Sequence, residues 1–352
     1  MKRIFIGIYL LIFFPFMLSG LTVEQGRIRL VLHEDSGRFS LYYLDDIEKN
    51  SYVSLLFQRD PRTSSTGLLL NNKMITLGST KSFEQKANKT VDGAMFSWVS
   101  SQIRVEQSFS FIKSDPNGLS DGISIQIKVT NISEDIQSVG VNLLYDTYLS
   151  ENNDYHFITS ENEKIEGEAG YTLQMPQYWM TQADNKNFVG LQSVLTGTDI
   201  TVPDKVIFSN WKRLSENLWN IQIQSNRNFN LLPYSINDSA VCQYYEPMKI
   251  SSGASRTIIA VLGAYTSSPF RFTGDSVPRS GTIDQVLSST SKIDSDNIEE
   301  LIQQDLIAIN DIISNIDSLL SFPDQISEER IEIIRRALQN LDVKKQQYSS
   351  SQ

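Results

Sequence analysis

The residues of this sequence that could do chemistry are densest between positions 146 and 156, directly after an apolar stretch. The set comprises three carboxylic acids, two amides and one imidazole: Asp146, Glu151, Asn152, Asn153, Asp154 and His156. Oxygen ligands of this kind bind Ca²⁺, but their order does not follow the D-x-[DN]-x-[DN]-G calcium loop. Zinc is disfavoured because the chain holds only two histidines and one cysteine. We therefore predict no metal ligands and no cofactor.

Catalysis by these residues is also weakly supported. A histidine-dependent mechanism would have to use His33 or His156, and no G-x-S-x-G, H-E-x-x-H or phosphate-binding glycine loop is present. Two carboxyl groups on either side of a glycosidic bond can hydrolyse it. An acidic chain offers many such pairs by chance, so we assign no catalytic residue and favour a non-enzymatic protein.

A structural interpretation of the same stretch fits its pattern better. Val139, Val141, Leu143 and Tyr145 alternate with other residues, as expected for one buried face of a β-strand. The residues Ser-Glu-Asn-Asn-Asp at 150–154 have side chains that stabilise turns by binding nearby backbone groups. The stretch is therefore predicted to be the end of a buried strand followed by a loop.

Aromatic residues supply the remaining candidates for a ligand site. Trp179 and Tyr178 lie in polar surroundings, where an indole or phenol ring could stack on a sugar. Trp211 and Trp219 are predicted to flank a hairpin and fill the space between two sheets. The candidate ligand-binding residues for a carbohydrate are Trp179, Tyr178, Asp146, Glu151 and Asp154.

The elements that must position these residues are mostly strands. Alternation with a period of two recurs in RIRLVLH (27–33), GRFSLYYL (37–44), QIRVEQSFSFIK (102–113), GISIQIKVTNIS (122–133), SVGVNLLYDTYL (138–149), KVIFSNW (205–211), LWNIQIQS (218–225) and RTIIAVLGAY (256–265). Short, frequent strands without a helical period are typical of antiparallel sandwiches. We predict a mainly β chain with one large antiparallel β-sandwich, a super-sandwich, over residues 26–266.

The pattern changes after the sandwich. Residues 267–293 are rich in Ser, Gly, Pro and Thr and are predicted to be a linker. Residues 294–347 are predicted to form an α-helical hairpin, because apolar residues there recur every three or four positions. The first helix has a longer apolar face than the second, so either the sandwich or a partner must cover the rest of it. The partner would be another envelope protein or a second copy of the chain. The candidate partner-binding residues are Ile302, Leu306, Ile309, Ile313 and Ile316.

The N-terminus and the charge suggest a compartment. Lys2 and Arg3 precede an apolar stretch that ends near Ser19 and Gly20, as in a signal peptide covering residues 1–20. We expect an exported protein, periplasmic or extracellular, without a transmembrane span once this segment is removed. The net charge of −10 disfavours nucleic acid as a partner. The single cysteine, Cys242, is interpreted as a buried structural thiol.

The order of several segments resembles that of a known type of protein. These segments are GVNLLYDTYLSENNDYHF (140–157), MPQYW (175–179), VPDKVIFSNW (202–211), LSENLW (214–219) and DSAVCQYYEPMKISSGASRTIIAVLG (238–263). They resemble exported bacterial β-super-sandwich proteins, of the galactose-mutarotase-like and glycoside-hydrolase accessory-domain type. Enzymes of this type use paired histidines and a carboxylate, and this chain has no matching pair, so the resemblance supplies no catalytic residue.

Two functions follow as hypotheses. The first is a non-enzymatic exported envelope protein that acts as a structural or protein-interaction module through its sandwich and its C-terminal helices. The alternative is a carbohydrate-binding or carbohydrate-active protein that uses a groove on the sandwich. The two differ in whether Trp179 and the acids near residue 150 gather around an open surface.

Overall fold

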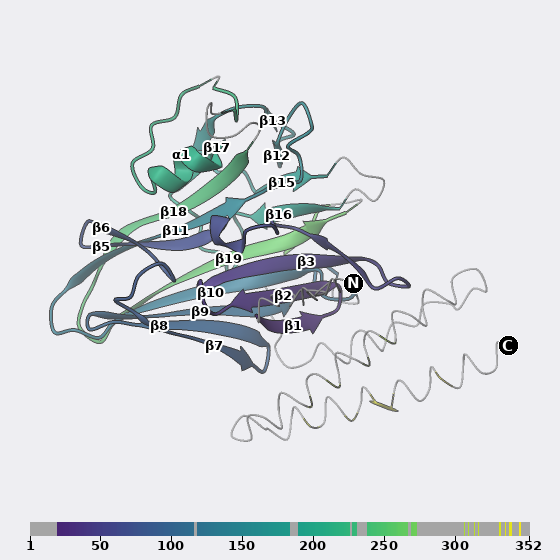
Figure 1. Ribbon diagram of the computed structural model, residues 1–352, viewed down its shortest axis with the longest axis horizontal. Coiled ribbons are helices and arrows are strands. Elements are labelled where there is room, and N and C mark those ends of the chain that lie inside the picture. Colours follow the sequence, from purple (N-terminus) through teal and green to yellow (C-terminus); the bar gives the residue numbers. More distant parts are fainter. Residues whose placement is uncertain are drawn as a thin grey trace, which may run out of the picture.

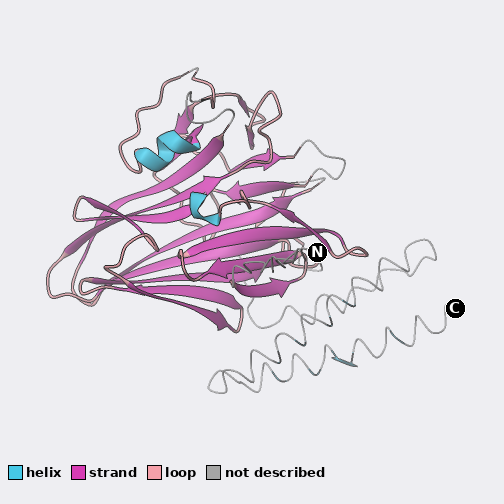
Figure 2. Ribbon diagram, viewed as in Figure 1, coloured by secondary structure: helices cyan, strands magenta, loops and turns pink. Residues whose placement is uncertain are grey.

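The computed structural model describes residues 20–115, 118–183, 189–225, 227–230, 238–266 and 269–272, together with nine single residues between 306 and 345. This part of the chain is mainly β, and its antiparallel strands form a large sandwich (Figure 1). The only helical elements between residues 20 and 272, among the residues described, are the 3₁₀ helix η1 and the helix α1 (Figure 2). The predicted fold class is confirmed for the sandwich.

The largest sheet has nine strands, and it places the middle of the chain beside its later part. In spatial order these are β13 (Lys164–Ile165), β12 (Phe157–Thr159), β15 (Tyr178–Gln182), β16 (Gly190–Val194), β19 (Ser255–Tyr265), β10 (Gly122–Asn131), β9 (Ile103–Ile112), β8 (Gly93–Val99) and β7 (Glu84–Thr90). Six of the seven residues of the outermost strand β7 are charged or polar, a composition that discourages pairing with another chain.

Two smaller sheets complete the sandwich. The six-stranded sheet has the order β14 (Ala169–Tyr171), β17 (Lys205–Asn210), β18 (Ser239–Ile250), β11 (Gln137–Asp146), β5 (Ser65–Leu70) and β6 (Lys73–Thr76). The four-stranded sheet has the order β1 (Leu21–Gln25), β2 (Ile28–His33), β3 (Arg38–Asp46) and β4 (Ser51–Ser54). The helix η1 (Pro61–Thr63) links β4 to β5, and α1 (Trp211–Glu216) follows β17.

One residue joins the two large sheets at their turns, and we call this contact the Asn131 joint. Strands β10 and β11 belong to different sheets, and so do β18 and β19, so the chain crosses between sheets twice at the same end. The backbone of Asn131 bonds Ala254 and Gly253 in the second turn. Its side-chain amide donates to the carbonyl oxygens of Asp135 at 2.7 Å and Ile250 at 2.9 Å. Both crossings are thereby fixed to each other.

The core lies between the sheets and follows from the alternation of the sequence. On β10 the side chains of Ile123, Ile125, Ile127 and Val129 are all fully buried, and they face the same core as Val139, Val141, Leu143 and Tyr145 of β11. Leu144 faces the opposite side of β11 and belongs to a second cluster. Burying an Ile or Leu side chain stabilises the fold by about 1.5–3 kcal/mol, so this periodicity fixes which face of each strand is inside.

The prediction of a strand at 218–225 is wrong. Its apolar residues Leu218, Trp219 and Ile221 pack on the outer face of the six-stranded sheet, together with residues of α1. Side chains take up the backbone groups that a strand would pair: Asn142 donates to the Leu218 carbonyl at 2.6 Å, and Glu168 accepts from the Gln224 N–H at 2.9 Å. The alternating pattern here marks a segment that covers a sheet.

Three regional predictions concern residues that the structure describes little or not at all. The signal peptide, apart from Gly20, lies outside the described residues, and so does most of the linker at 267–293. Of the predicted hairpin, nine residues are described, all helical: Leu306, Ile309, Ile313, Ile316, Ile331, Arg335, Leu338, Gln339 and Lys345. Ile302 is not among them. No helix in the described part of the chain has the length and apolarity to span a membrane.

The packing of Trp179 yields a prediction for stability. Its indole is fully buried between the sheets, with ring centroids 5.7 Å from Phe157 and 6.2 Å from Phe208. Trp179→Ala should therefore lower the free energy of unfolding by about 3–5 kcal/mol. Trp219→Ala, a matched control on the outer face, should cost about 1–2 kcal/mol. Urea unfolding followed by circular dichroism measures both, and equal losses would contradict this account of the core.

Candidate functional site

The loop after β11 closes one end of the sandwich, as the sequence predicted for a strand end. The Thr147 N–H donates to the Ser239 carbonyl, and the Ser239 hydroxyl donates back to the Thr147 carbonyl at 3.2 Å. Further along, the Ser150 hydroxyl and the Asn153 amide both donate to the Gln182 carbonyl at the end of β15. The loop therefore ties the six-stranded sheet to the nine-stranded sheet.

Four acids lie near this end, where the charges of their neighbours act on Asp146 and Glu151, and we call them the carboxyl cluster: Asp60, Asp146, Glu151 and Asp238. Asp146 ends β11 and pairs with Ala240, which brings Asp238 beside it at the start of β18. Asp60 is the N-cap of η1. Ser64 follows η1, and its hydroxyl oxygen accepts a hydrogen bond from the Asp146 N–H at 3.0 Å. Glu151 comes from the closing loop. Four separate segments thus supply one acid each.

The environment favours the neutral form of two members of the carboxyl cluster, Asp146 and Glu151. Asp146 is only 3% exposed, and burial is the main cause that raises its pKa to about 7, with the charges of Asp238 and Asp60 adding to it. A hydrogen bond with Thr63 acts in the opposite direction. Burial followed by the charges of Asp238 and Asp146 raises the pKa of Glu151 to about 8, although a hydrogen bond from the Ser239 backbone opposes this. Burial and neighbouring like charges together disfavour ionisation of both acids.

Two acids that exchange protons near neutral pH can act as general acid and general base. They can also bind neutral hydroxyl groups, because a protonated acid donates a hydrogen bond and an ionised one accepts it. An anionic ligand would be repelled. Among the residues that the structure describes, no group of three or more His, Cys, Asp or Glu side chains is arranged to hold a metal ion.

The other predicted ligand residues lie elsewhere. Trp179 is buried in the core, which corrects its interpretation as the aromatic ring most available to a sugar. Tyr178 is half-buried, and burial, followed by the charges of Tyr265 and Glu161, raises its pKa. Neither of these two residues belongs to the carboxyl cluster. Asp154 is exposed on the closing loop. The structure therefore brings together Asp146 and Glu151 only.

Several other interpretations of single residues can be compared with the structure. His156 packs on Phe229 with ring centroids 4.5 Å apart, and burial lowers its pKa to about 4, so it is a neutral core residue. Trp211 and Trp219 pack on the outer face of the six-stranded sheet, so their assignment to the space between the sheets is wrong. Cys242 is buried and free, and burial raises the pKa of its thiol to about 12, which confirms the structural interpretation.

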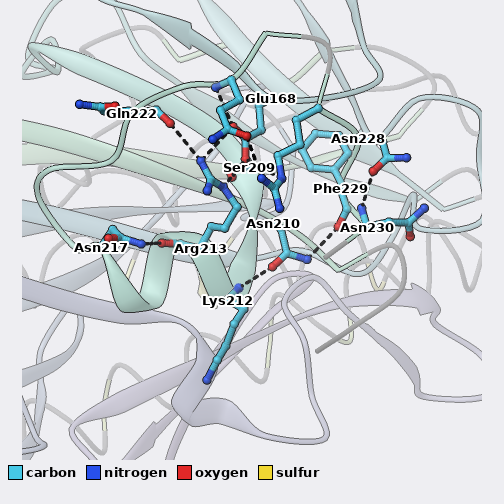
Figure 3. Close-up of polar contacts among 12 residues, drawn as sticks. Glu168, Ser209, Asn210, Lys212, Arg213, Asn217, Gln222, Asn228, Phe229 and Asn230 are labelled. Carbon is cyan, nitrogen blue, oxygen red and sulfur yellow. Dashed lines mark hydrogen bonds and ion pairs between the residues drawn. The ribbon is translucent and has the colours of Figure 1, made fainter. Parts of the chain in front are cut away.

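A second polar network holds the segment that follows β17 (Figure 3). The side chain of Glu168 is 1% exposed and accepts from Arg213 at 2.5 Å, from the Ser209 hydroxyl at 2.7 Å and from the Gln224 N–H at 2.9 Å. Arg227 lies 3.9 Å from the same carboxylate. Each oxygen of Glu168 therefore has partners inside the fold, so this network anchors the backbone.

Two members of the carboxyl cluster, Asp60 and Asp238, were not predicted from the sequence. Asp60 reads as an ordinary helix cap, and Asp238 precedes a strand whose partner lies almost a hundred residues earlier. The pairing of β11 with β18 is what places them beside Asp146. Asp238 could have been predicted to lie near Asp146 only if the pairing of β11 with β18 had been predicted first.

No known family profile and no curated protein matches this chain. Similar solved structures include a galactose mutarotase related enzyme from Lactobacillus acidophilus, with a TM-score of 0.45 and 10% identity over 72% of this chain and 100% of that one. A galactose mutarotase-like protein from Lactobacillus casei has a TM-score of 0.43 and 8% identity over 70% of this chain and 100% of its own. Heparan sulfate lyase HepC from Pedobacter heparinus has a TM-score of 0.35 and 10% identity over 69% of this chain and 34% of its own.

The first two of these neighbours are of the galactose mutarotase-like type that the sequence resembled. A likeness at this level carries no information about substrate or activity.

The carboxyl cluster predicts an unusual pH dependence of stability. A folded-state pKa above the unfolded value means that unfolding releases a proton, so the free energy of unfolding falls as pH rises from about 4 to about 7. The loss from Asp146 is up to about 1.4 kcal/mol per pH unit in that range. Asp146→Asn cannot ionise and should flatten this part of the curve. Asp154→Asn, the control on the same loop, should keep the wild-type slope.

Chemical denaturation at pH 5, 6, 7 and 8 measures these slopes. Parallel curves for the wild type and Asp146→Asn would contradict the assignment of Asp146 as the protonated group.

Proposed function

We propose that this protein is an exported envelope protein that acts as a non-enzymatic interaction module, with its C-terminal helices as the binding surface. The observation that supports this most is the exposure of apolar side chains on helical residues. Leu306 and Ile313 are 47% and 51% exposed, and Ile331 and Leu338 are 43% and 48% exposed. Each pair is seven residues apart, the spacing of one face of a helix that packs on another surface.

The partner in this proposal is another protein of the envelope, and a second copy of the chain is the alternative. Covering the exposed half of each of these side chains would contribute about 1 kcal/mol, so four of them supply a useful part of a binding free energy. Export rests on the basic and apolar residues at the N-terminus.

Ile313→Asp tests the proposal because it places a charge in the middle of the exposed stripe. The full-length variant should lose association by about ten-fold or more while the sandwich keeps its unfolding free energy. Leu173→Asp is the matched control, because Leu173 is 95% exposed on the sandwich and should change neither property. Sedimentation velocity measures self-association, and cross-linking in envelope extract measures capture of a partner. Equal behaviour of the wild type and Ile313→Asp in both assays would refute the proposal.

The second candidate function is binding or conversion of a neutral saccharide at the carboxyl cluster. It is favoured by the position of Glu151, which is half-buried beside Asp146 with its pKa raised to about 8 by burial and by neighbouring acids. Such a pair suits hydroxyl groups and disfavours uronic acids or phosphosugars.

Titration calorimetry with neutral and acidic saccharides distinguishes this candidate. If a neutral saccharide binds, Glu151→Gln should weaken it by about ten-fold, and Asp154→Asn should leave it unchanged. Binding that survives Glu151→Gln, or a preference for acidic saccharides, would exclude the carboxyl cluster as the site.

A further inference from the structure

The outer face of the nine-stranded sheet has a groove that crosses four neighbouring strands. Directly paired residues form a row across it, which from β9 to β16 consists of Ile112, Gly122, Gly263 and Gln192. Leu262, the neighbour of Gly263 in sequence, faces the core, so Gly263 and the rest of the row face outward. Two glycines between larger side chains leave a depression, which we call the glycine groove.

The glycine groove holds the side chain of Phe270. A Cβ atom on Gly263 would lie 2.2 Å from the Cγ of this ring, and a Cβ atom on Gly122 would lie 2.8 Å from its Cζ. The ring therefore rests directly on the backbone of both strands. Phe270 is 4% exposed, and it forms an apolar cluster with Ile112 and Val261 that is separate from the core between the sheets.

The space for this ring explains why Gly122 and Gly263 are glycines. Neither residue has a positive φ angle, so the path of the strand does not require glycine at these positions. Glycine weakens the interior of a strand because it has no side chain to pack, and it often marks a place where a ligand or another chain segment approaches closely. The two glycines of the groove serve the second purpose.

Gln192 binds the backbone of the same phenylalanine. Its side chain is 0% exposed, its Nε2 donates to the Phe270 carbonyl at 2.9 Å, and its Oε1 accepts from the Phe270 N–H at 2.9 Å. A side-chain amide that pairs with both backbone groups of one residue replaces a neighbouring strand. Residues 269–272, which we call the strap, belong to no helix or strand, so side chains of the sandwich hold them in place.

We propose that the glycine groove is a peptide-binding site for an extended segment that carries a phenylalanine, and that the strap is the ligand that fills it within the chain. The site recognises one ring by its shape and one residue by its backbone, as grooves for extended peptides do. Because the strap forms no strand and its cluster is separate from the core, it can leave the groove while the sheets stay intact. The chain continues after the strap to the helical residues between 306 and 345, so the strap fixes where that part leaves the sandwich.

A peptide added to the full-length chain tests the proposal. Phe270→Ala empties the groove, and a fluorescent Ser-Ser-Pro-Phe-Arg-Phe peptide, the sequence of residues 267–272, should then bind, as measured by fluorescence anisotropy. The wild type should bind it about ten-fold more weakly or less, because its own strap competes at a high effective concentration. Phe270→Ala/Gly263→Ala is the matched control. The atoms nearest to a Cβ on Gly263 all belong to the Phe270 ring, so the added methyl group fills the empty groove and should abolish binding.

Trypsin provides a second measurement that does not require Phe270→Ala to fold. Arg271 is exposed within the strap, and a segment that is held in place is cleaved only when it detaches. Gln192→Leu removes both hydrogen bonds to the strap and should accelerate cleavage after Arg271 by about ten-fold or more. Gln126→Leu, which changes an exposed glutamine on the same face of the sheet, should keep the wild-type rate. Mass spectrometry identifies the cut.

Two results would overturn the proposal. The first is a Phe270→Ala variant, folded by circular dichroism, that binds no peptide or binds it equally well when Gly263→Ala is added. The second is equal cleavage after Arg271 in the wild type and in Gln192→Leu, which would show that the strap is not held by the groove.

Discussion

The Asn131 joint is the contact on which the arrangement of the two large sheets depends. The turn between β10 and β11 crosses from one sheet to the other, and the turn between β18 and β19 crosses beside it. A fully buried amide that bonds both turns leaves the two crossings no freedom to slide. The Asn131 joint fixes the register of β10 with β19 and of β11 with β18 at this end. The residues farther along these strands are positioned by that register.

The carboxyl cluster lies at the opposite end of β11, where that inherited register brings Asp146 beside the start of β18. Most buried acids in proteins are paired with cations, and two arginines in the described part of the chain bind other acids. Arg213 is committed to Glu168, and Arg62 is committed to Asp60. Burial and the neighbouring acids raise the pKa of both Asp146 and Glu151, so protonation relieves the repulsion between them near neutral pH.

The sequence predicted the class of fold well because the alternation of apolar residues reports which strand face is buried. Val139 to Tyr145 behave as the pattern requires, and so do Cys242 and the closing loop. The prediction failed where tertiary partners replaced the usual ones. The alternation at 218–225 covers a sheet because Asn142 and Glu168 bind its backbone, and Trp179 is buried because β12 and β17 supply Phe157 and Phe208 around it. Asp238 entered the cluster through a strand pairing between distant parts of the chain, which local periodicity does not contain.

The buried amide of Asn131 also bears on how the protein can be produced. Asn131, Ile132 and Ser133 form an Asn-x-Ser sequence, which eukaryotic secretory systems modify with a glycan on the amide nitrogen. In the folded protein that nitrogen donates to Asp135 and Ile250, and the residue is 0% exposed. A glycan can therefore be attached only before the chain folds, and a chain that carries it cannot close both turns. Folding and glycosylation at this position exclude each other, so a eukaryotic secretory host would divide the product between folded, unmodified chains and glycosylated chains whose sheets are not joined.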